Sequence, residues 1–503
     1  MTQHETFEVA PSDAQGPLVL AVDVGSTATR GALYDATGRP VGRRVKVEHA
    51  FTTGADGTSV IDADQVADEV ADVISRLAGR DLGAPIAGVA MDTFASSLVG
   101  VDAGGRALTP CFTYADSRSA AQVGQLRERL DEAVVQQRTG TRLHTSYVAP
   151  RLLWLRETQP ELVAQVSRWL SLGEHVQQRL LGATAASTPM AAWSGLLDRR
   201  TGRWDEEMLA VCGTTVEQLS PVQDPGVPIE GVDAGRVAAR WPALAGAAWF
   251  PVIADGLASN LGAGAGDASA MAASAATSGA VRVLVRDVPE QIPSGLWCYR
   301  VDARRSLLGG AVNDVGRLVA WLQATLRLPD DDDALDAVLA ADPDPRAPAV
   351  VPFLSGERST GWAASARAVV ADLSAGTSPE AVFRGSAEGV ATTYARVVEQ
   401  LVEVAGRPER VIASGRITQS LPHLLQLVAD ATGTPVQRVD LKRVTLRGTA
   451  LMALEALAPD VSRAQVPLAA TYEPQERRAA HYAAVRERFE ALYEASVGRG
   501  GGA

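Results

Sequence analysis

Short apolar runs separated by turn residues dominate the beginning of the chain. Leu18 to Val22 is an unbroken apolar run followed by Asp23 and Gly25, which predicts a buried strand leading into a tight turn. Two further segments, Arg30 to Tyr34 and Val41 to Val47, also have the composition of strands. The three segments together predict an antiparallel β-meander.

The pattern then changes from strand to helix. Apolar side chains share one helical face from Val66 to Leu77, Asp62 can cap the start of that helix, and Gly79 can end it. Ile86 to Met91 predicts a second buried strand and Leu98 to Val101 a third. Strands that alternate with helices predict an α/β sheet covered on both faces.

The second half begins much as the first does. After a mostly helical middle section, Ala120 to Val211, the Pro- and Gly-rich segment Pro221 to Pro251 is predicted to link two halves. Ala272 to Thr277 and Ala280 to Val285 then predict two strands joined by small residues. We therefore expect two related domains, each presenting a small-residue hairpin turn toward a shared cleft.

Composition excludes several classes of protein. With 503 residues the chain is long enough for two large domains or about three of ordinary size. The net charge of −12 argues against nucleic acid and anionic membranes as main partners. Lys46 and Lys442 are the only lysines and neither follows a glycine, so the sequence contains no P-loop.

Cysteine usage and the N-terminal segment predict a reducing compartment. Cys111, Cys212 and Cys298 are far apart and odd in number, without the paired spacing of a zinc site. Met1 to Gly16 has no apolar core of the kind found in signal peptides, and Ala243 to Val285 is too interrupted to span a membrane. We therefore expect a cytoplasmic protein without membrane attachment.

The octet from Asp23 to Arg30 carries the most chemical information. A carboxylate at a strand end can hold a hydrated magnesium ion, and Gly25 permits close backbone approach. The hydroxyl groups of Ser26 and Thr27 can donate to phosphate oxygens, while Arg30 adds a fixed positive fork. The set suits the phosphates of a metal-bound nucleotide; a capped turn with a surface arginine is the alternative.

A second candidate carboxylate, Asp255, follows an apolar strand and precedes a Gly- and Ala-rich segment. An acid in that position can orient or deprotonate a hydroxyl nucleophile, although Asp-Gly is also an ordinary turn. Ser414-Gly415 follows the strand predicted from Val411 to Ala413, and Gly448-Thr449-Ala450 is predicted to open a helix. Glycine after a strand lets a ring or a phosphate approach the backbone.

Taken in order, these segments resemble the FGGY family of carbohydrate kinases, from about Leu18 to Leu457. Asp23 to Arg30 is similar to the N-terminal phosphate motif of that family. The other motifs follow in the family order: Tyr114-Ala115-Asp116-Ser117-Arg118, Thr139-Gly140, Leu143-His144 with Tyr147, Asp255-Gly256, Ala276-Thr277-Ser278, Gly309 to Asn313, Gly356-Glu357-Arg358-Ser359, and Ser414-Gly415 through Ser420.

The resemblance implies an α/β fold of two actin-like, ribonuclease H-like domains with the active-site cleft between them. Residues 17–254 are expected to form the N-terminal domain with the sugar site and the phosphate loop. Residues 255–460 are expected to form the C-terminal, ATP-binding domain. Residues 461–503 remain as a helical extension with a frayed tail.

The resemblance also implies roles for individual residues. Asp255 is the base that deprotonates the sugar hydroxyl, and Asp23 holds Mg²⁺ through water. The residues expected to bracket the phosphates of ATP are Ser26, Thr27, Arg30, Thr277 and Gly310, and those expected near its adenine are Ser414 and Gly415. Closure of the two domains should exclude water, which would otherwise accept the phosphoryl group.

On the acceptor side, the expected ligands are Ser96, Asp116, Arg118, His144 and Tyr147. Arg118 can pair bidentately with the carboxylate of a sugar acid. The alternative for Asp116 and Arg118 is an ion pair that only braces its loop. For His144 the alternative is a loop residue whose hydrogen bonds are satisfied locally.

Gly309 to Asn313 and the Gly-Glu-Arg-Ser stretch are most similar to the gluconate kinase branch of the family. Four departures accompany this likeness: Ala95-Ser96 in place of a Met-His pair, Arg151 in place of lysine, Thr360 in place of proline, and Arg416 in place of a second glycine. Because of Ala95-Ser96, a pentulose or a bulkier acceptor stays an alternative. Arg416 could change how adenine is held.

Three alternatives to a sugar or sugar-acid kinase are considered. A xylulokinase or another pentulose or polyol kinase would share every motif. A non-enzymatic actin-like protein would share the two hairpins but give the segment around Asp116 no purpose. A degenerate kinase kept as a sugar sensor is disfavoured by the intact Asp23 and Asp255. A homodimer is one option for the assembly.

Overall fold

The computed structural model describes residues 7–497, which form two compact units. Unit 1 contains the chain up to Gly262 together with Cys298–Ser306 and Lys442–Gln465. Unit 2 contains Ala263–Trp297, Leu307–Leu441 and the chain from Val466 onward. The predicted frayed tail, 498–503, and the first six residues of the N-terminal segment lie outside the described residues.

The division of the chain differs from the boundaries expected from the sequence. The segment Pro221 to Pro251 does not link two halves, because it stays within unit 1 and the chain leaves that unit only after Gly262. Asp255 accordingly belongs to unit 1. Lys442–Gln465 returns to unit 1, so neither unit is one continuous stretch of chain, and the expected domains 17–254 and 255–460 stay a prediction.

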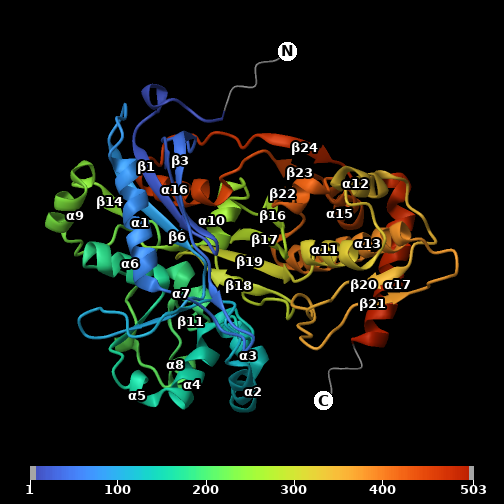
Figure 1. Ribbon diagram of the computed structural model, residues 1–503, viewed down its shortest axis with the longest axis horizontal. Coiled ribbons are helices and arrows are strands. Elements are labelled where there is room, and N and C mark those ends of the chain that lie inside the picture. The colour runs from blue at the N-terminus through green and yellow to red at the C-terminus, as the bar shows by residue number, and fades with distance from the viewer. Residues whose placement is uncertain (1–6, 498–503) are drawn as a thin grey trace. The chain divides into compact units, whose positions relative to one another are not determined.

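The central sheet of unit 1 contains the predicted meander (Figure 1). Its strand order is β14-β6-β1-β2-β3, and β15 also pairs with β6. The β2 strand runs antiparallel to both β1 and β3, whereas β6 is parallel to β1, β14 and β15. The strands are β1 (Leu18–Val24), β2 (Ala28–Tyr34), β3 (Pro40–Glu48), β6 (Ile86–Thr93), β14 (Ala248–Trp249) and β15 (Ile253–Ala254).

Both faces of this sheet are buried, as the unbroken apolar run of β1 predicts. Leu20 and Val22 point into a core formed with α1 (Ala63–Ala78) and α6 (Leu172–Leu181). Val19 and Ala21 point to the opposite face, which α16 (Val444–Leu457) covers. Asp62 and Gly79 cap α1 as predicted.

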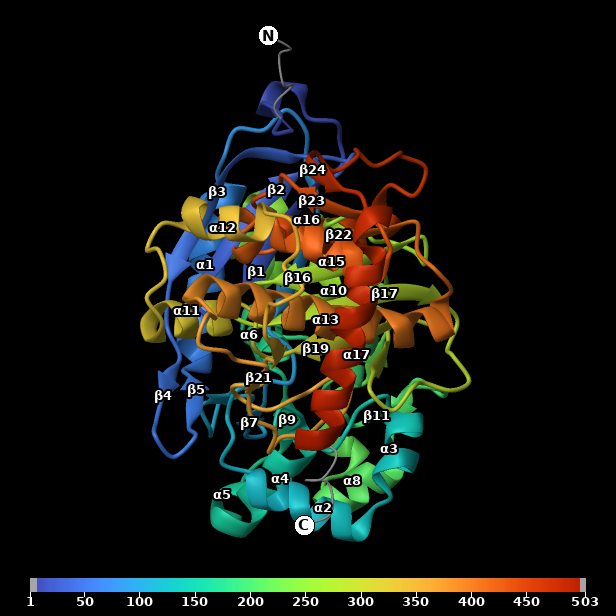
Figure 2. The ribbon, with the colours of Figure 1, turned by 90° about the vertical axis from the view of Figure 1, so that its right-hand side faces the viewer.

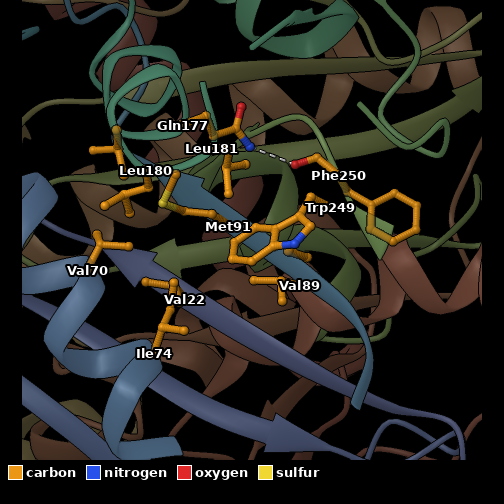
Figure 3. Close-up of a pocket in the computed structure, with 12 residues that line it drawn as sticks. Val22, Val70, Ile74, Val89, Met91, Gln177, Leu180, Leu181, Trp249 and Phe250 are labelled. Carbon is orange, nitrogen blue, oxygen red and sulfur yellow. Dashed lines mark hydrogen bonds between the residues drawn. The ribbon is translucent and has the colours of Figure 1, made fainter. Parts of the chain in front are cut away.

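Figure 3 shows the interior between α1, α6 and the sheet. Its walls are almost entirely apolar, and the one amide among the labelled side chains, Gln177, donates to the carbonyl of Phe250 over 2.8 Å. The space therefore belongs to the packed core of unit 1.

The α10 helix (Asp255–Gly262) packs against α16 at unusually close range. A Cβ atom on Gly448 would lie 1.7 Å from the carbonyl oxygen of Ala258, and one on Gly262 would lie 1.8 Å from that of Val444. The prediction that Gly448-Thr449-Ala450 opens a helix is wrong, because these residues lie inside α16. Gly448 is needed for the helix contact instead.

The rest of unit 1 is mostly helical, as predicted for the middle section. The predicted strand at Leu98 to Val101 is β7 (Val99–Val101), which pairs with β9 (Arg168–Leu170) rather than with the main sheet. The helices are α2 (Ala120–Arg129), α3 (Glu132–Thr139), α4 (Val148–Thr158), α5 (Pro160–Val163), α7 (Thr188–Ser194), α8 (Glu206–Cys212) and α9 (Ala234–Arg240).

Short strands and 3-10 turns complete unit 1. The β4, β5 and β8 strands form a small sheet, β10 pairs with β13, and β11 pairs with β12. The strands are β4 (Thr52–Thr53), β5 (Ser59–Ile61), β8 (Cys111–Phe112), β10 (Ala186–Ser187), β11 (Leu197–Asp198), β12 (Arg203–Trp204) and β13 (Val222–Gln223). The three 3-10 turns are Pro11–Asp13, Val216–Gln218 and Pro242–Leu244.

The strands of unit 2 form a sheet in the order β19-β17-β16-β22-β23-β24. The β16 strand pairs antiparallel with β17 and parallel with β22. The strands are β16 (Ala270–Ala275), β17 (Gly279–Arg286), β19 (Arg305–Val312), β22 (Arg410–Ser414), β23 (Val436–Val439) and β24 (Leu468–Tyr472), with β20 (Ala349–Val351) and β21 (Val369–Ala371) forming a separate pair. The β18 strand (Trp297–Arg300) lies mostly in the Cys298–Ser306 segment of unit 1.

Helices of unit 2 pack on this sheet and on one another. Figure 2 shows α17 alongside α13 and α15, which it contacts. The helices are α11 (Gly316–Thr325), α12 (Asp332–Ala340), α13 (Pro379–Ala405), α14 (Ile417–Ser420), α15 (Leu424–Thr432) and α17 (Ala479–Ser496). Within residues 7–497, no helix combines the length and the apolar character needed to cross a membrane.

Candidate active site

Three carboxylates converge where the parallel strands of unit 1 end. Asp23 in β1 is in register with Asp92 in β6, and Ile253 of β15 is the other neighbour of Asp92. Asp255 follows β15 directly as the first residue of α10. Since parallel strands bring their carboxyl ends to one edge of a sheet, the two predicted acids share an edge with a third, Asp92.

Burial dominates the electrostatics of this edge. It raises the pKa of Asp23 above the usual value, while the Arg30 guanidinium acts in the opposite direction. Asp92 is fully buried, and its pKa is raised well above the ordinary aspartate value by burial and by the neighbouring Asp23. The Thr449 hydroxyl donates to Asp92 Oδ2. Burial therefore disfavours two negative charges on these neighbouring acids at the same time.

The β1–β2 hairpin presents the expected phosphate-binding groups. Ser26 and Thr27 are exposed at its turn, which the Gly25 N–H closes by donating to the carbonyl of Ala28 over 3.1 Å. The Arg30 Nη1 lies 3.4 Å from Asp23 Oδ2, and its Nη2 donates to Thr27 Oγ1 over 3.1 Å. The arginine therefore links the acid to the turn.

Unit 2 carries a corresponding hairpin between β16 and β17. Thr277 is exposed at the turn, and its carbonyl accepts from the N–H groups of Val315 and Arg317. Ser414 ends β22 in register with Ser274 of β16, and Gly415 follows it with φ of 112°. A Cβ on Gly415 would lie 2.3 Å from the carbonyl oxygen of Ala275. Thr277, Ser414 and Gly415 therefore lie at one edge of the unit 2 sheet.

Gly310 has a different environment from these three residues. It is buried in β19, where a Cβ would lie 2.6 Å from Val397 Cγ1 and 2.9 Å from Ser359. The adjoining Ala311 N–H donates to Ser359 Oγ over 3.0 Å, and the Ser359 N–H donates back to the Ala311 carbonyl. Close packing against the Gly-Glu-Arg-Ser segment accounts for the glycine.

Asp116 and Arg118 form a local ion pair. The Arg118 Nη2 lies 2.6 Å from Asp116 Oδ2, and the Ser59 N–H donates to the same oxygen over 3.0 Å. Asp116 is almost completely buried, whereas Arg118 stacks over the ring of Trp154 with Cζ 4.4 Å from its centroid. The pair braces its loop, and Nη1 is the guanidinium nitrogen for which residues 7–497 provide no hydrogen-bond acceptor.

The other expected sugar ligands lie in polar and aromatic surroundings. His144 Nδ1 accepts from the Ser146 N–H over 3.1 Å, which leaves the proton on Nε2 in the neutral ring. The Tyr147 hydroxyl lies 2.8 Å from that of Tyr299, whose ring stacks on Trp193 with centroids 3.8 Å apart. Tyr147 thus belongs to an aromatic cluster with two residues that the motifs did not indicate.

Ser96 has an unusual backbone conformation, with φ of 57°. Its hydroxyl donates to the carbonyl of Trp193 over 2.6 Å, and its own carbonyl accepts from Arg151 over 2.8 Å. Arg151 is fully buried and also donates to the carbonyl of Thr113. The arginine that replaces the expected lysine therefore fixes the backbone around Ser96.

The side chains next to Ser96 form an apolar patch. Ala95, Met190 and Ala254 pack together, and Trp193 covers them. Ala254 immediately precedes Asp255, so this patch adjoins the candidate base.

The motif analysis missed Asp92, although the sequence contains a signal for it. It follows the apolar run Ile86 to Met91 just as Asp23 follows Leu18 to Val22. The sequence contains no such signal for Tyr299 and Thr449, because both residues belong to segments far along the chain that rejoin unit 1.

Comparison with known proteins adds independent information. A model of the FGGY family of carbohydrate kinases, N-terminal domain, matches residues 18–256, and the model of the C-terminal domain of that family matches residues 271–457. A gluconokinase of Bacillus subtilis (strain 168) is 24% identical over 425 residues, which are 80% of this chain and 80% of that protein.

Two further relatives extend the comparison. A xylulose kinase of Escherichia coli (strain K12) is 27% identical over 407 residues, covering 78% of this chain and 82% of its own. The crystal structure of gluconate kinase from Lactobacillus acidophilus has a TM-score of 0.88 at 26% identity, covering 96% of this chain and 99% of that one.

Proposed function

Because the chain belongs to the FGGY family of carbohydrate kinases, which are ATP-dependent phosphotransferases, we propose that it phosphorylates a hydroxyl group of a gluconate-like sugar acid. The convergence of Asp23, Asp92 and Asp255 at one edge of the unit 1 sheet is the observation that carries this proposal. Phosphoryl transfer depends mainly on positioning and charge stabilisation, and this edge supplies both.

Asp255 is proposed as the general base that orients and deprotonates the acceptor hydroxyl. It stands at the start of α10, which the contact between Gly448 and Ala258 holds against α16. The base is therefore carried by a rigid element, as a near-attack geometry requires. Arg30 is proposed to stabilise the charge on the transferring group.

Asp23 is proposed to hold Mg²⁺ through water. Magnesium commonly keeps several waters and takes one or two carboxylates together with substrate phosphates, so the Asp23 carboxylate at the strand end fits the ion. Among residues 7–497 no group of three or more Asp, Glu, His or Cys side chains could hold a metal ion by itself. The ion would neutralise charge that develops on the phosphates.

The proposed nucleotide contacts come from both units. In unit 1 they are Ser26 and Thr27. In unit 2 they are Thr277, Ser414 and Gly415, which share a sheet edge. Gly310 is proposed to act indirectly, through its packing against Ser359.

On the acceptor side, Arg118 Nη1 is proposed to bind the carboxylate of the sugar acid, with the Asp116 pair fixing the guanidinium plane. Ser96, His144 and Tyr147 are proposed to bind hydroxyl groups.

A pentulose such as xylulose is the second candidate acceptor. The apolar patch of Ala95, Met190 and Ala254 favours it, because these side chains offer no hydrogen bonds to the hydroxyl groups along a longer polyol acid. Xylulose kinases also match the chain at similar identity.

An acceptor panel tests the proposal. ADP release is measured with gluconate, xylulose, ribulose and glycerol, in the presence and absence of Mg²⁺. We expect the highest kcat/KM with gluconate. A preference for xylulose would select the second candidate, and no turnover with any polyol would contradict the proposal.

A further inference from the structure

A buried histidine stands behind the phosphate-binding hairpin. The His49 side chain has no exposed surface, and its Nε2 lies 2.7 Å from the carbonyl oxygen of Gly25. The His49 backbone N–H donates to the carbonyl of Thr27 over 3.1 Å. His49, which directly follows β3, therefore holds two carbonyl groups of the turn.

The second ring nitrogen is held as firmly. His49 Nδ1 lies 2.7 Å from Glu69 Oε2, and the hydroxyl of Thr29 donates to the same oxygen over 2.8 Å. Gln65 Nε2 donates to the other carboxylate oxygen over 2.9 Å. Glu69 is itself buried on α1, so the ring is fixed between a helix and the hairpin.

The direction of these hydrogen bonds follows from their partners. A carbonyl oxygen only accepts, so His49 Nε2 must carry a proton that it donates to Gly25. An ionised Glu69 also only accepts, so an imidazolium donating from both nitrogens satisfies the site. Charge assistance shortens and strengthens such bonds.

Fixing the Gly25 carbonyl fixes the next N–H group as well. The Gly25–Ser26 peptide is trans, so the Ser26 N–H points opposite to the Gly25 carbonyl. The carbonyl points inward to His49, and the N–H therefore points outward at the exposed turn. Ser26 N–H has no acceptor within residues 7–497, which leaves it to an anion.

We propose that His49, held by Glu69, is a positioning residue that aims the Ser26 N–H at the transferring phosphate of ATP. The inference rests on the proposed function only in naming ATP as the anion. A preorganised backbone donor stabilises charge in a phosphoryl-transfer transition state without reorganisation at the moment of reaction.

The test compares His49→Ala with wild type in two assays. Isothermal titration with ATP and Mg²⁺ measures nucleotide affinity without any acceptor, and steady-state kinetics uses the best acceptor of the panel. We expect kcat to fall about 10- to 100-fold, ATP affinity to weaken about three- to tenfold and the KM of the acceptor to stay within about twofold.

His175→Ala is the matched control. His175 is equally buried in unit 1, and its Nε2 lies 2.8 Å from an oxygen of Asp64, away from the hairpin. We expect it to lower the melting temperature as His49→Ala does but to leave kcat unchanged. If the two variants have the same kcat and ATP affinity, the proposal is wrong.

Two conservative variants keep the test decisive if His49→Ala does not fold. In His49→Gln the side-chain amide can still donate to Gly25, so part of the lost kcat should return. Glu69→Gln keeps a neutral ring donating from Nε2, and kcat should fall only about two- to fivefold. Wild-type kcat and ATP affinity in both would overturn the proposal. A wild-type protein that binds ATP but phosphorylates no acceptor would instead contradict the proposed function.

Discussion

The two hairpins of the molecule share a topology but not a chemistry. In unit 1, β1 pairs antiparallel with β2 and parallel with β6; in unit 2, β16 pairs antiparallel with β17 and parallel with β22. Asp23 faces Asp92 across the parallel pair in the first case, whereas Ser274 faces Ser414 in the second. The same strand arrangement thus serves acids in one unit and hydroxyl and backbone groups in the other.

The chemical difference between the two hairpin edges predicts different tasks for the two units. Acidic side chains are concentrated at the unit 1 edge, where burial raises the pKa of Asp23 and of Asp92. The unit 2 edge offers small groups that let a ligand approach the backbone, and at Gly415 the Ala275 carbonyl leaves no room for a Cβ atom. Substitutions in unit 1 should therefore affect kcat most, and those in unit 2 should affect nucleotide affinity or stability.

The largest effect is expected from Asp255→Asn. Loss of the base should lower kcat about 10²- to 10⁴-fold, because general base catalysis contributes that much. ATP affinity, measured by titration calorimetry, should be unchanged because the substitution preserves shape. Retention of wild-type kcat would remove Asp255 from the mechanism.

Asp23→Asn should have the next largest effect. Without the ionised carboxylate, kcat should fall about 10²-fold and the Mg²⁺ concentration for half-maximal rate should rise. A Mg²⁺ titration of the rate measures both. An unchanged Mg²⁺ dependence would show that the ion is held elsewhere.

Gly415→Ala tests the close backbone contact at the edge of the unit 2 sheet. Left-handed φ and overlap with the Ala275 carbonyl should lower the free energy of unfolding by roughly 2 kcal/mol. Gly406→Ala is the control, because Gly406 has φ of 76° but open space around it, so only the strain contributes. Chemical denaturation compares the two, and equal losses would argue against the overlap.

Asp92→Asn should change how stability depends on pH. A folded-state pKa raised above the ordinary value stabilises the protein at low pH, and that stability is lost as pH rises through the raised pKa. The variant should remove this loss, flattening the dependence by up to about 1.4 kcal/mol per pH unit and raising the melting temperature at alkaline pH. A parallel dependence in both proteins would mean that Asp92 does not titrate there.

The smallest effect is expected from Thr277→Ala. Its backbone carbonyl, held by Val315 and Arg317, keeps the turn in place without the hydroxyl. The KM for ATP should rise only about threefold, because one exposed hydroxyl donor is lost while the turn keeps its shape. A loss as large as that of Asp23→Asn would contradict the division of tasks between the hairpins.

Much of the fold could be predicted from local pattern. The meander, the capping of α1 and the hairpin of unit 2 follow from apolar runs and turn residues, and the ordered motifs led to the family that the comparisons confirm. Gly448 was misplaced because a glycine inside a helix resembles one that opens it. Only the contact with α10 distinguishes the two.

The site was predicted less completely. Asp23 and Asp255 were found from strand ends, but Tyr299 and Thr449 come from segments that rejoin unit 1 late, which no local pattern reveals. The roles proposed for Asp23 and Asp255 stay predictions. The same holds for the cleft between the domains, a homodimer, a cytoplasmic location and the absence of nucleic-acid and membrane partners.

The late return of α16 has a consequence for synthesis on the ribosome. When Gly262 has emerged, Asp23, Asp92 and Asp255 are already translated, yet the face of the sheet that contains Val19 and Ala21 still lacks its cover. That apolar face stays open to water or chaperones until α16 emerges. A protein cut after Gly262 should therefore aggregate, although it carries all three acids.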